Sequence, residues 1–145
     1  MSARTLDELL AAASARIQRL VPQEALDAVE SGALLVDIRS DVDRERDGIV
    51  PGALHIPRTV LEWRLAGDGA WRNPHIGGAD RQVVLLCDHG CSSILAAANL
   101  VELGFSRAGD VIGGYEAWRA AGLPTASATP YRRAPGEPAG MRPPD

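Results

Sequence analysis

Short runs of consecutive apolar residues constrain the fold of this chain more than any other feature. Residues 82–86, Gln-Val-Val-Leu-Leu, form the clearest run, and residues 33–38, Ala-Leu-Leu-Val-Asp-Ile, form a second. A strand with one face in water alternates apolar and polar residues, whereas a strand buried on both faces is apolar nearly throughout. We therefore predict two central strands in a sheet that is covered on both sides, with shorter strands at residues 53–56 and 111–112.

Helical patterns separate these predicted strands. Thr5 and Glu8 have the spacing of a capping box, and apolar residues then recur at helical spacing as far as Leu20. Further helices are predicted at residues 22–30, 59–63, 94–103 and 115–121, while residues 39–48 and 67–81 are expected to be loops. Strands that alternate with helices predict an α/β domain, with a mostly parallel central sheet flanked by helices on both faces.

The chain is expected to have three parts. An amphipathic helix should occupy residues 1–21, the α/β domain residues 22–124, and a disordered tail residues 125–145. The tail consists largely of Ala, Pro, Ser, Thr and Arg and has no periodic apolar face to bury. We therefore expect its removal to cost little stability.

Charge and cysteine usage exclude several classes of protein. The net charge of −4 argues against a nucleic-acid-binding protein, which would usually carry a basic face. All fifteen cationic residues are arginine, which is typical of a GC-rich genome. No apolar run approaches the roughly 20 residues that span a bilayer, and no signal peptide is evident. Cys87 and Cys91 lie in one short segment rather than in a disulfide framework, so we expect a reducing, cytoplasmic location.

The loop after the strand at residues 82–86 carries the candidate chemistry. It reads Cys87-Asp88-His89-Gly90-Cys91-Ser92-Ser93 and leads directly into a predicted helix. Ligands of parallel sheets bind at the carboxyl ends of the strands, and a helix N-terminus directs backbone N–H groups at an anion. A cysteine held there should favour its reactive thiolate form. Gly90 allows the tight turn, and Ser92 or Ser93 can cap the helix or donate to a bound anion.

This loop resembles the active loop of rhodanese-like sulfurtransferases, which has the form Cys-x-His-Gly-x-Ser-Ser in single-domain thiosulfate sulfurtransferases. Two flanking segments agree with the family's signatures. Residues 35–39 with 48–57 resemble the amino-terminal signature, and residues 113–118 with 121–124 resemble the carboxyl-terminal one. Three motifs in the right order and spacing make a specific match that covers about residues 22–124.

The resemblance implies a two-step transfer of sulfur with no metal or organic cofactor. A donor such as thiosulfate would give its outer sulfur to Cys87, and cyanide or a cellular thiol would then accept it from the persulfide. Phosphatases and arsenate reductases of the same fold use one more loop residue and normally end the loop in arginine. The loop from Cys87 to Ser92 has neither feature, which disfavours phosphatase activity.

Asp88 is the main departure from an anion-binding loop. A carboxylate beside the nucleophile should repel a dianionic donor and disfavour the thiolate, and a protonated His89 would compensate in part. We expect substrate contacts from loop residues 88–93, and from Arg44 and Arg58 if these two steer an anion. Asp37 and Arg39 are expected to tie loops together near the site. No metal is expected, because Cys87, His89 and Cys91 cannot easily converge on one tetrahedral centre within five residues.

Two other functions remain open at this stage. The chain could be a rhodanese-like binding or regulatory module that transfers little sulfur, which Asp88 favours and Cys87 disfavours. It could also be a thiol redox sensor that uses Cys87 and Cys91. The expected partners are a small-molecule sulfur donor and a thiol or cyanide acceptor, without nucleic acid or membrane. The sequence does not decide the oligomeric state.

Overall fold

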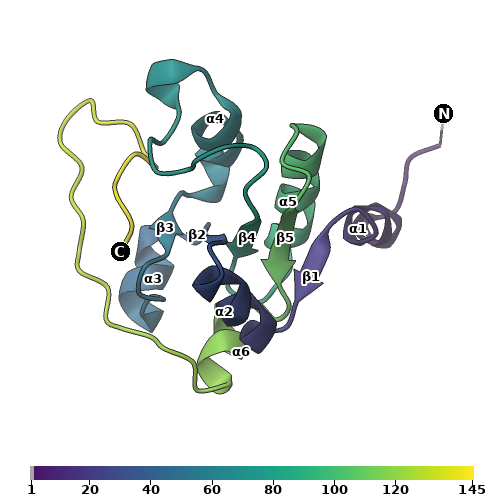
Figure 1. The fold of residues 1–145 in the computed structure, drawn as a ribbon, viewed down its shortest axis with the longest axis horizontal. Coiled ribbons are helices and arrows are strands. Elements are labelled where there is room, and N and C mark those ends of the chain that lie inside the picture. The colour runs from purple at the N-terminus through teal and green to yellow at the C-terminus, as the bar shows by residue number, and fades with distance from the viewer. Residues whose placement is uncertain (1) are drawn as a thin grey trace.

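The computed structural model describes residues 2–145, which form a five-stranded parallel sheet with helices on both faces (Figure 1). The strand order is β1-β5-β4-β2-β3. The strands are β1 (Gln18–Leu20), β2 (Leu34–Asp37), β3 (Leu54–His55), β4 (Val83–Leu86) and β5 (Ala108–Val111). The helices are α1 (Leu6–Ser14), α2 (Pro22–Glu30), α3 (Asp41–Asp47), α4 (Leu61–Ala66), α5 (Ser92–Glu102) and α6 (Gly114–Ala120). The predicted α/β class and parallel sheet are confirmed.

The two central strands bury alternate residues on opposite faces. Leu34, Val36, Val83 and Leu85 pack with α4 and α5, whereas Leu35, Val84 and Leu86 pack with α2 and α6. All residues of β2 and β4 are buried, because helices cover both faces. This explains why the apolar runs in the sequence are continuous.

The N-terminal segment differs from the predicted long helix. Helix α1 ends at Ser14 and packs on α5, and residues 18–20 form the edge strand β1, which pairs with β5. Gly109 lies opposite Gln18, and a Cβ atom on it would stand 1.9 Å from the Gln18 carbonyl oxygen. The strand can approach only because that partner is a glycine, a condition that the helical spacing of residues 6–20 does not reveal.

Helix α3 occupies a segment that was expected to be a loop. Its N-cap is Ser40, whose hydroxyl accepts a hydrogen bond from the Asp43 backbone N–H at 3.1 Å. Asp41 and Asp43 stand in the first turn and Arg44 and Arg46 in the last, so the charges complement the helix dipole. These charges and the cap stabilise a helix that has no apolar periodicity.

Residues 125–145 also depart from the expected disordered tail. They form no helix, but they follow a defined path beside α3 and β3, on the side of the molecule opposite α1 (Figure 1). The Asp145 backbone exchanges hydrogen bonds with Gly52 and Ala53, and Ala126 forms a bridge with Ile49. Polar contacts rather than an apolar face hold this segment, which is why its composition gave no sign of docking.

Candidate active site

Cys87 stands at the carboxyl end of the central strand β4, at the floor of a short loop that leads into α5. The residue is 4% exposed. Its Sγ accepts a hydrogen bond from the Gly90 backbone N–H at 3.0 Å and lies 3.2 Å from the Ser93 hydroxyl oxygen. The loop therefore folds back over its own cysteine, as the predicted cradle requires.

Three glycines allow this loop to close against the turn before α6. Gly90 has a φ of +81°, and a Cβ atom there would lie 2.6 Å from the Gly113 nitrogen. A Cβ atom on Gly114 would lie 2.4 Å from the Cys87 carbonyl oxygen, which accepts a hydrogen bond from Tyr115 N–H at 2.7 Å. Residues 113–115 thus hold the active loop in place through close backbone contacts.

A buried polar chain runs from Cys87 to the edge of the sheet. The Ser93 hydroxyl donates to the Asp110 carboxylate at 2.7 Å, and both residues are fully buried. Arg19 on β1 donates to both Asp110 oxygens, at 2.9 and 3.0 Å, and to the Gly90 carbonyl at 3.1 Å. The hydrogen bonds to Asp110 raise the pKa of Arg19 above its ordinary value. Ser93 was expected to cap the helix or bind an anion, but its hydroxyl is committed to Asp110.

Arg19 and Asp110 are parts of the site that the sequence analysis missed. Asp110 carried one usable signal, since a charged residue within a strand between Ala108 and Val111 must have a buried partner. Arg19 carried none, because its segment read as a helix outside the domain.

Sequence comparison decides the family. The Rhodanese-like domain profile matches residues 21–121. Thiosulfate sulfurtransferase GlpE of Pseudomonas savastanoi is 35% identical over 104 residues, covering 71% of this chain and 88% of that protein. The protein of the same name from Actinobacillus succinogenes is 33% identical, covering 75% of this chain and 90% of the relative. The chain belongs to the rhodanese-like family. It is a rhodanese-like sulfurtransferase.

Two solved structures share the fold of this chain. A polysulfide-sulfur transferase homodimer from Wolinella succinogenes is 25% identical, with a TM-score of 0.68 over 88% of this chain and 90% of that one. A protein of unknown function from Rhodopseudomonas palustris, described as a possible tyrosine phosphatase, is 30% identical, with a TM-score of 0.77 over 87% of this chain and 97% of that one.

A cavity of about 280 Å³ opens above the cysteine of this rhodanese-like domain. The active loop, the segment after β2 and helix α3 surround it. Its lining residues are Ile38, Arg39, Ser40, Asp43, Cys87, Asp88, His89, Cys91 and Ser92. The structure therefore brings five of the predicted loop residues around one cavity, with Gly90 beneath them and Ser93 turned toward Asp110.

The entrance of this cavity is acidic. Partial burial, followed by the hydrogen bond and negative charge of Asp43, raises the pKa of Asp88 above its ordinary value. The Ser40 hydroxyl in turn lowers the pKa of Asp43. His89 is exposed, and its Nδ1 forms a hydrogen bond with the Glu116 carboxylate at 2.5 Å. The negative charge of Asp88 therefore faces the cavity, and His89, which contacts Glu116, offsets little of it.

Arg44 and Arg58 do not reach this cavity, contrary to the expectation that they steer an anion. Arg44 is 2% exposed and binds the Asp37 carboxylate at 3.0 Å, and it also contacts Asp145. Arg58 forms an ion pair with Glu62 at 2.8 Å. Both guanidinium groups have structural partners, because α3 and the turn after β3 direct them away from the loop.

Arg39 is the arginine that lines the cavity. It binds Asp37 through two hydrogen bonds and the Gly48 carbonyl at 2.9 Å, and its guanidinium lies 3.9 Å from the centre of the Tyr115 ring. Burial would raise the pKa of Asp37, but the hydrogen bonds and charges of Arg39 and Arg44 hold it below its ordinary value. Arg39 thus ties loops together, as expected, and also gives the cavity its one arginine.

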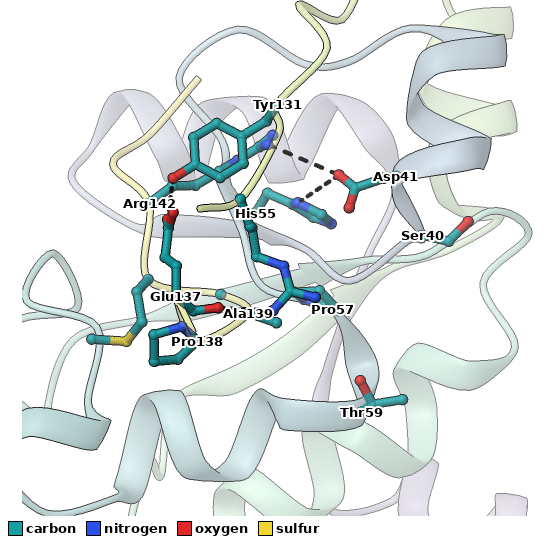
Figure 2. Close-up of a pocket in the computed structure, with 13 residues that line it drawn as sticks. Ser40, Asp41, His55, Pro57, Thr59, Tyr131, Glu137, Pro138, Ala139 and Arg142 are labelled. Atoms are coloured by element: carbon teal, nitrogen blue, oxygen red, sulfur yellow. Dashed lines mark hydrogen bonds and ion pairs between the residues drawn. The ribbon is translucent and has the colours of Figure 1, made fainter. Parts of the chain in front are cut away.

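A second cavity, of about 240 Å³, lies between the domain and residues 131–142 (Figure 2). His55 and Arg142 both point toward Asp41 there, and Tyr131 contacts Glu137. Burial, and then the charge of Arg44, lowers the pKa of His55. No cysteine lines this second cavity.

Within residues 2–145, no group of three or more His, Cys, Asp or Glu side chains is placed to hold a metal ion. No helix of the described chain has the length and apolar character needed to cross a membrane.

Proposed function

We propose that the protein transfers sulfane sulfur through a persulfide on Cys87. The observation that carries the proposal is the Cys87 sulfur at the floor of an open cavity, where the Gly90 N–H already donates to it. The names of the sulfurtransferase relatives support the same chemistry. The free thiols of Cys87 and Cys91 are consistent with a cytoplasmic location.

The transfer proceeds in two displacements. The Cys87 thiolate attacks the outer sulfur of the donor, a bond forms between the two sulfur atoms, and the donor's own S–S bond breaks. Thiosulfate would leave as sulfite, and a persulfide donor would leave as a thiolate. Mercaptopyruvate has no S–S bond, so its C–S bond would break instead and pyruvate would leave as its enolate. A cyanide ion or an acceptor thiolate then attacks the outer sulfur and releases the Cys87 thiolate. Loop N–H groups can hold the negative charge of the persulfide, as an oxyanion hole holds an alkoxide.

The acidic entrance disfavours thiosulfate, because its two negative charges lie on one small ion. Asp88 and Asp43 both line the cavity, and its one arginine, Arg39, is bound to Asp37. Burial and Asp43 raise the pKa of Asp88 by more than the charge of Arg39 lowers it. A dianion entering past these carboxylates loses binding energy. We therefore propose that a low-molecular-weight persulfide is a better donor than thiosulfate.

Intact mass after incubation with a donor tests the function. The protein is treated separately with thiosulfate, mercaptopyruvate and glutathione persulfide, and each sample is then treated with cyanide. We expect one added sulfur atom that cyanide removes as thiocyanate. Cys87→Ser should show no added sulfur while melting like the wild type. Sulfur loading of Cys87→Ser at the wild-type rate would overturn the assignment of Cys87.

A redox function is the second candidate, because Cys91 lines the same cavity as Cys87. Peroxide treatment separates the two functions. Loss of two hydrogen atoms would indicate a Cys87–Cys91 disulfide, and Cys91→Ser would abolish it. A wild-type protein that gains sulfur from donors and forms no disulfide supports the transferase alone.

A further inference from the structure

The buried chain from Cys87 through Ser93 and Asp110 to Arg19 joins the nucleophile to a strand that precedes the matched family region. The rhodanese-like match begins at residue 21, whereas Arg19 lies on β1. Arg19 nevertheless binds the active loop directly, through the Gly90 carbonyl. The N-terminal segment is therefore structurally part of the site.

The direction of the hydrogen bonds shows how these buried polar side chains affect the protonation of the Cys87 sulfur. A serine hydroxyl has one proton and two lone pairs. The Ser93 proton goes to Asp110, over the short distance of 2.7 Å. Ser93 consequently presents a lone pair to Cys87, and at 3.2 Å it accepts the S–H proton. An anionic sulfur would face that lone pair until the hydroxyl turned away from Asp110.

Asp110 and Arg19 act on Cys87 with opposite signs. The Asp110 carboxylate draws the Ser93 proton away from the sulfur and adds negative charge, so it favours the thiol. Arg19 adds a compensating positive charge that acts on both Cys87 and Cys91. Asp110 is fully buried, and Arg19 is 27% exposed at its side chain, so solvent screens this pair only in part.

We propose that Asp110, acting through Ser93, holds the resting Cys87 as a thiol, and that Arg19 offsets this effect and fixes the active loop at Gly90. Ser93 touches the reacting sulfur, while Asp110 and Arg19 are positioning residues. This inference deepens the proposed sulfur-transfer function and rests on Cys87 as its nucleophile. It also gives β1 a role in reactivity.

Other charged groups face Cys87 and stay unchanged in the test. Asp88, His89 and Cys91 belong to the loop, Arg39 follows β2, and Asp43 comes from α3. They are the same in every variant, so a difference in the alkylation midpoint between variants reports on Ser93, Asp110 and Arg19. Glu116 of α6 acts on His89 rather than on the sulfur.

The pH dependence of Cys87 alkylation tests the proposal. Iodoacetamide reacts with the thiolate, and its rate on the Cys87 peptide is followed by mass spectrometry between pH 5 and 10. Arg19→Gln leaves Asp110 without its cation, so the midpoint should rise by about one pH unit. Asp110→Asn removes the anion and frees the Ser93 proton for the sulfur, so the midpoint should fall by about one unit.

Matched variants control for net charge. Arg16→Gln makes the charge change of Arg19→Gln three residues away, and Asp68→Asn makes the charge change of Asp110→Asn at an exposed position. Neither control should move the midpoint. Arg19→Lys keeps the charge without the two-pronged contact and should stay near the wild-type midpoint. If Asp110→Asn does not fold, the alkylation midpoints of Arg19→Gln and Arg19→Lys are compared instead, and a higher midpoint in Arg19→Gln alone supports the proposal.

Opposite shifts of the two variants support the proposal, and shifts in the same direction, or none, overturn it. An Arg19→Lys shift as large as that of Arg19→Gln would also overturn it, because lost structure rather than charge would then be the cause. The assay uses no sulfur donor. If the wild type accepts sulfur from no donor while the midpoints still move apart, the proposed function fails and this inference stands.

Discussion

At the scale of single residues, the site combines a nucleophile that the family pattern predicts with charges that it does not. Cys87 and Gly90 have the positions that the loop motif indicated. Asp88 departs from that motif, and the structure adds Asp43 beside it at the cavity entrance. The sequence shows Asp88 in the loop but does not show that Asp43 lies beside it. Asp43 is on α3, in a segment that was predicted to be a loop, and only the fold brings it to Asp88.

Asp88→Asn should improve the use of thiosulfate. Two like charges at about 4–6 Å with intermediate screening cost on the order of 1–3 kcal/mol, or roughly ten- to a hundredfold in apparent affinity. Glutathione persulfide should gain much less, because its carboxylates are several bonds away from the sulfur that is transferred. Asp68→Asn, which makes the same charge change on an exposed turn, should leave the ratio of the two donors unaltered. Equal rates for wild type and Asp88→Asn with both donors would contradict a role for this carboxylate.

The same carboxylate predicts a pH dependence. The pKa of Asp88 is raised, so Asp88 takes up its proton at a higher pH than an ordinary aspartate as the solution is acidified. Protonation removes the repelling charge, so thiosulfate affinity should rise as the pH falls through that raised pKa. Initial rates at subsaturating thiosulfate, normalised to those with glutathione persulfide, measure the effect. Asp88→Asn should show no such rise.

At the scale of elements, the sequence predicted the buried strands, their helices and the edge strand β3, but it missed the edge strand β1. Strands β2 and β4 are predictable because burial on both faces leaves a continuous apolar run. The edge strand β1 was read as helix, because the spacing of Ile17 and Leu20 fits both structures and the partner strand decides between them. Helix α3 was missed because charges and a cap, rather than apolar spacing, stabilise it.

Gly109→Ala should detach β1 from the sheet. Its Cβ would meet the Gln18 carbonyl oxygen, so β1 must move and Arg19 must lose its contacts with Asp110. We expect faster amide exchange at residues 18–20 and a lower melting temperature. The pH midpoint of Cys87 alkylation should also shift toward the midpoint of Arg19→Gln. Gly122→Ala strains the backbone at a φ of +72° with nothing within 4 Å, so it should leave amide exchange at residues 18–20 unchanged even if it lowers the melting temperature. Unchanged exchange at residues 18–20 would show that β1 accommodates the methyl group.

At the scale of the whole molecule, residues 125–145 connect elements that are distant in the sequence. Arg64 donates to the Ala139 carbonyl at 2.6 Å, and Asn73 donates to the carbonyls of Gly140 and Arg142. Arg44 contacts Asp145 and also holds Asp37, which binds the cavity residue Arg39. The segment thus stabilises the side of the domain on which α3 and β3 lie, and it reaches the active cavity through a chain of buried ion pairs.

Removal of residues 125–145 should therefore destabilise the domain, contrary to the expectation from composition. Several hydrogen bonds worth about 0.5–1.5 kcal/mol each are lost, and Arg44 keeps only Asp37. We expect a loss of about 2–4 kcal/mol, seen as a melting temperature lower by roughly 5–15 °C. Removal of residues 1–4, of which residues 2–4 lie outside every helix and strand, is the comparison truncation and should cost far less. Asp145→Asn should show part of the loss, because it weakens the contact with Arg44 and leaves the backbone bonds to Gly52 and Ala53 in place. Equal melting temperatures for the two truncations would mean that residues 125–145 do not dock on the domain in solution.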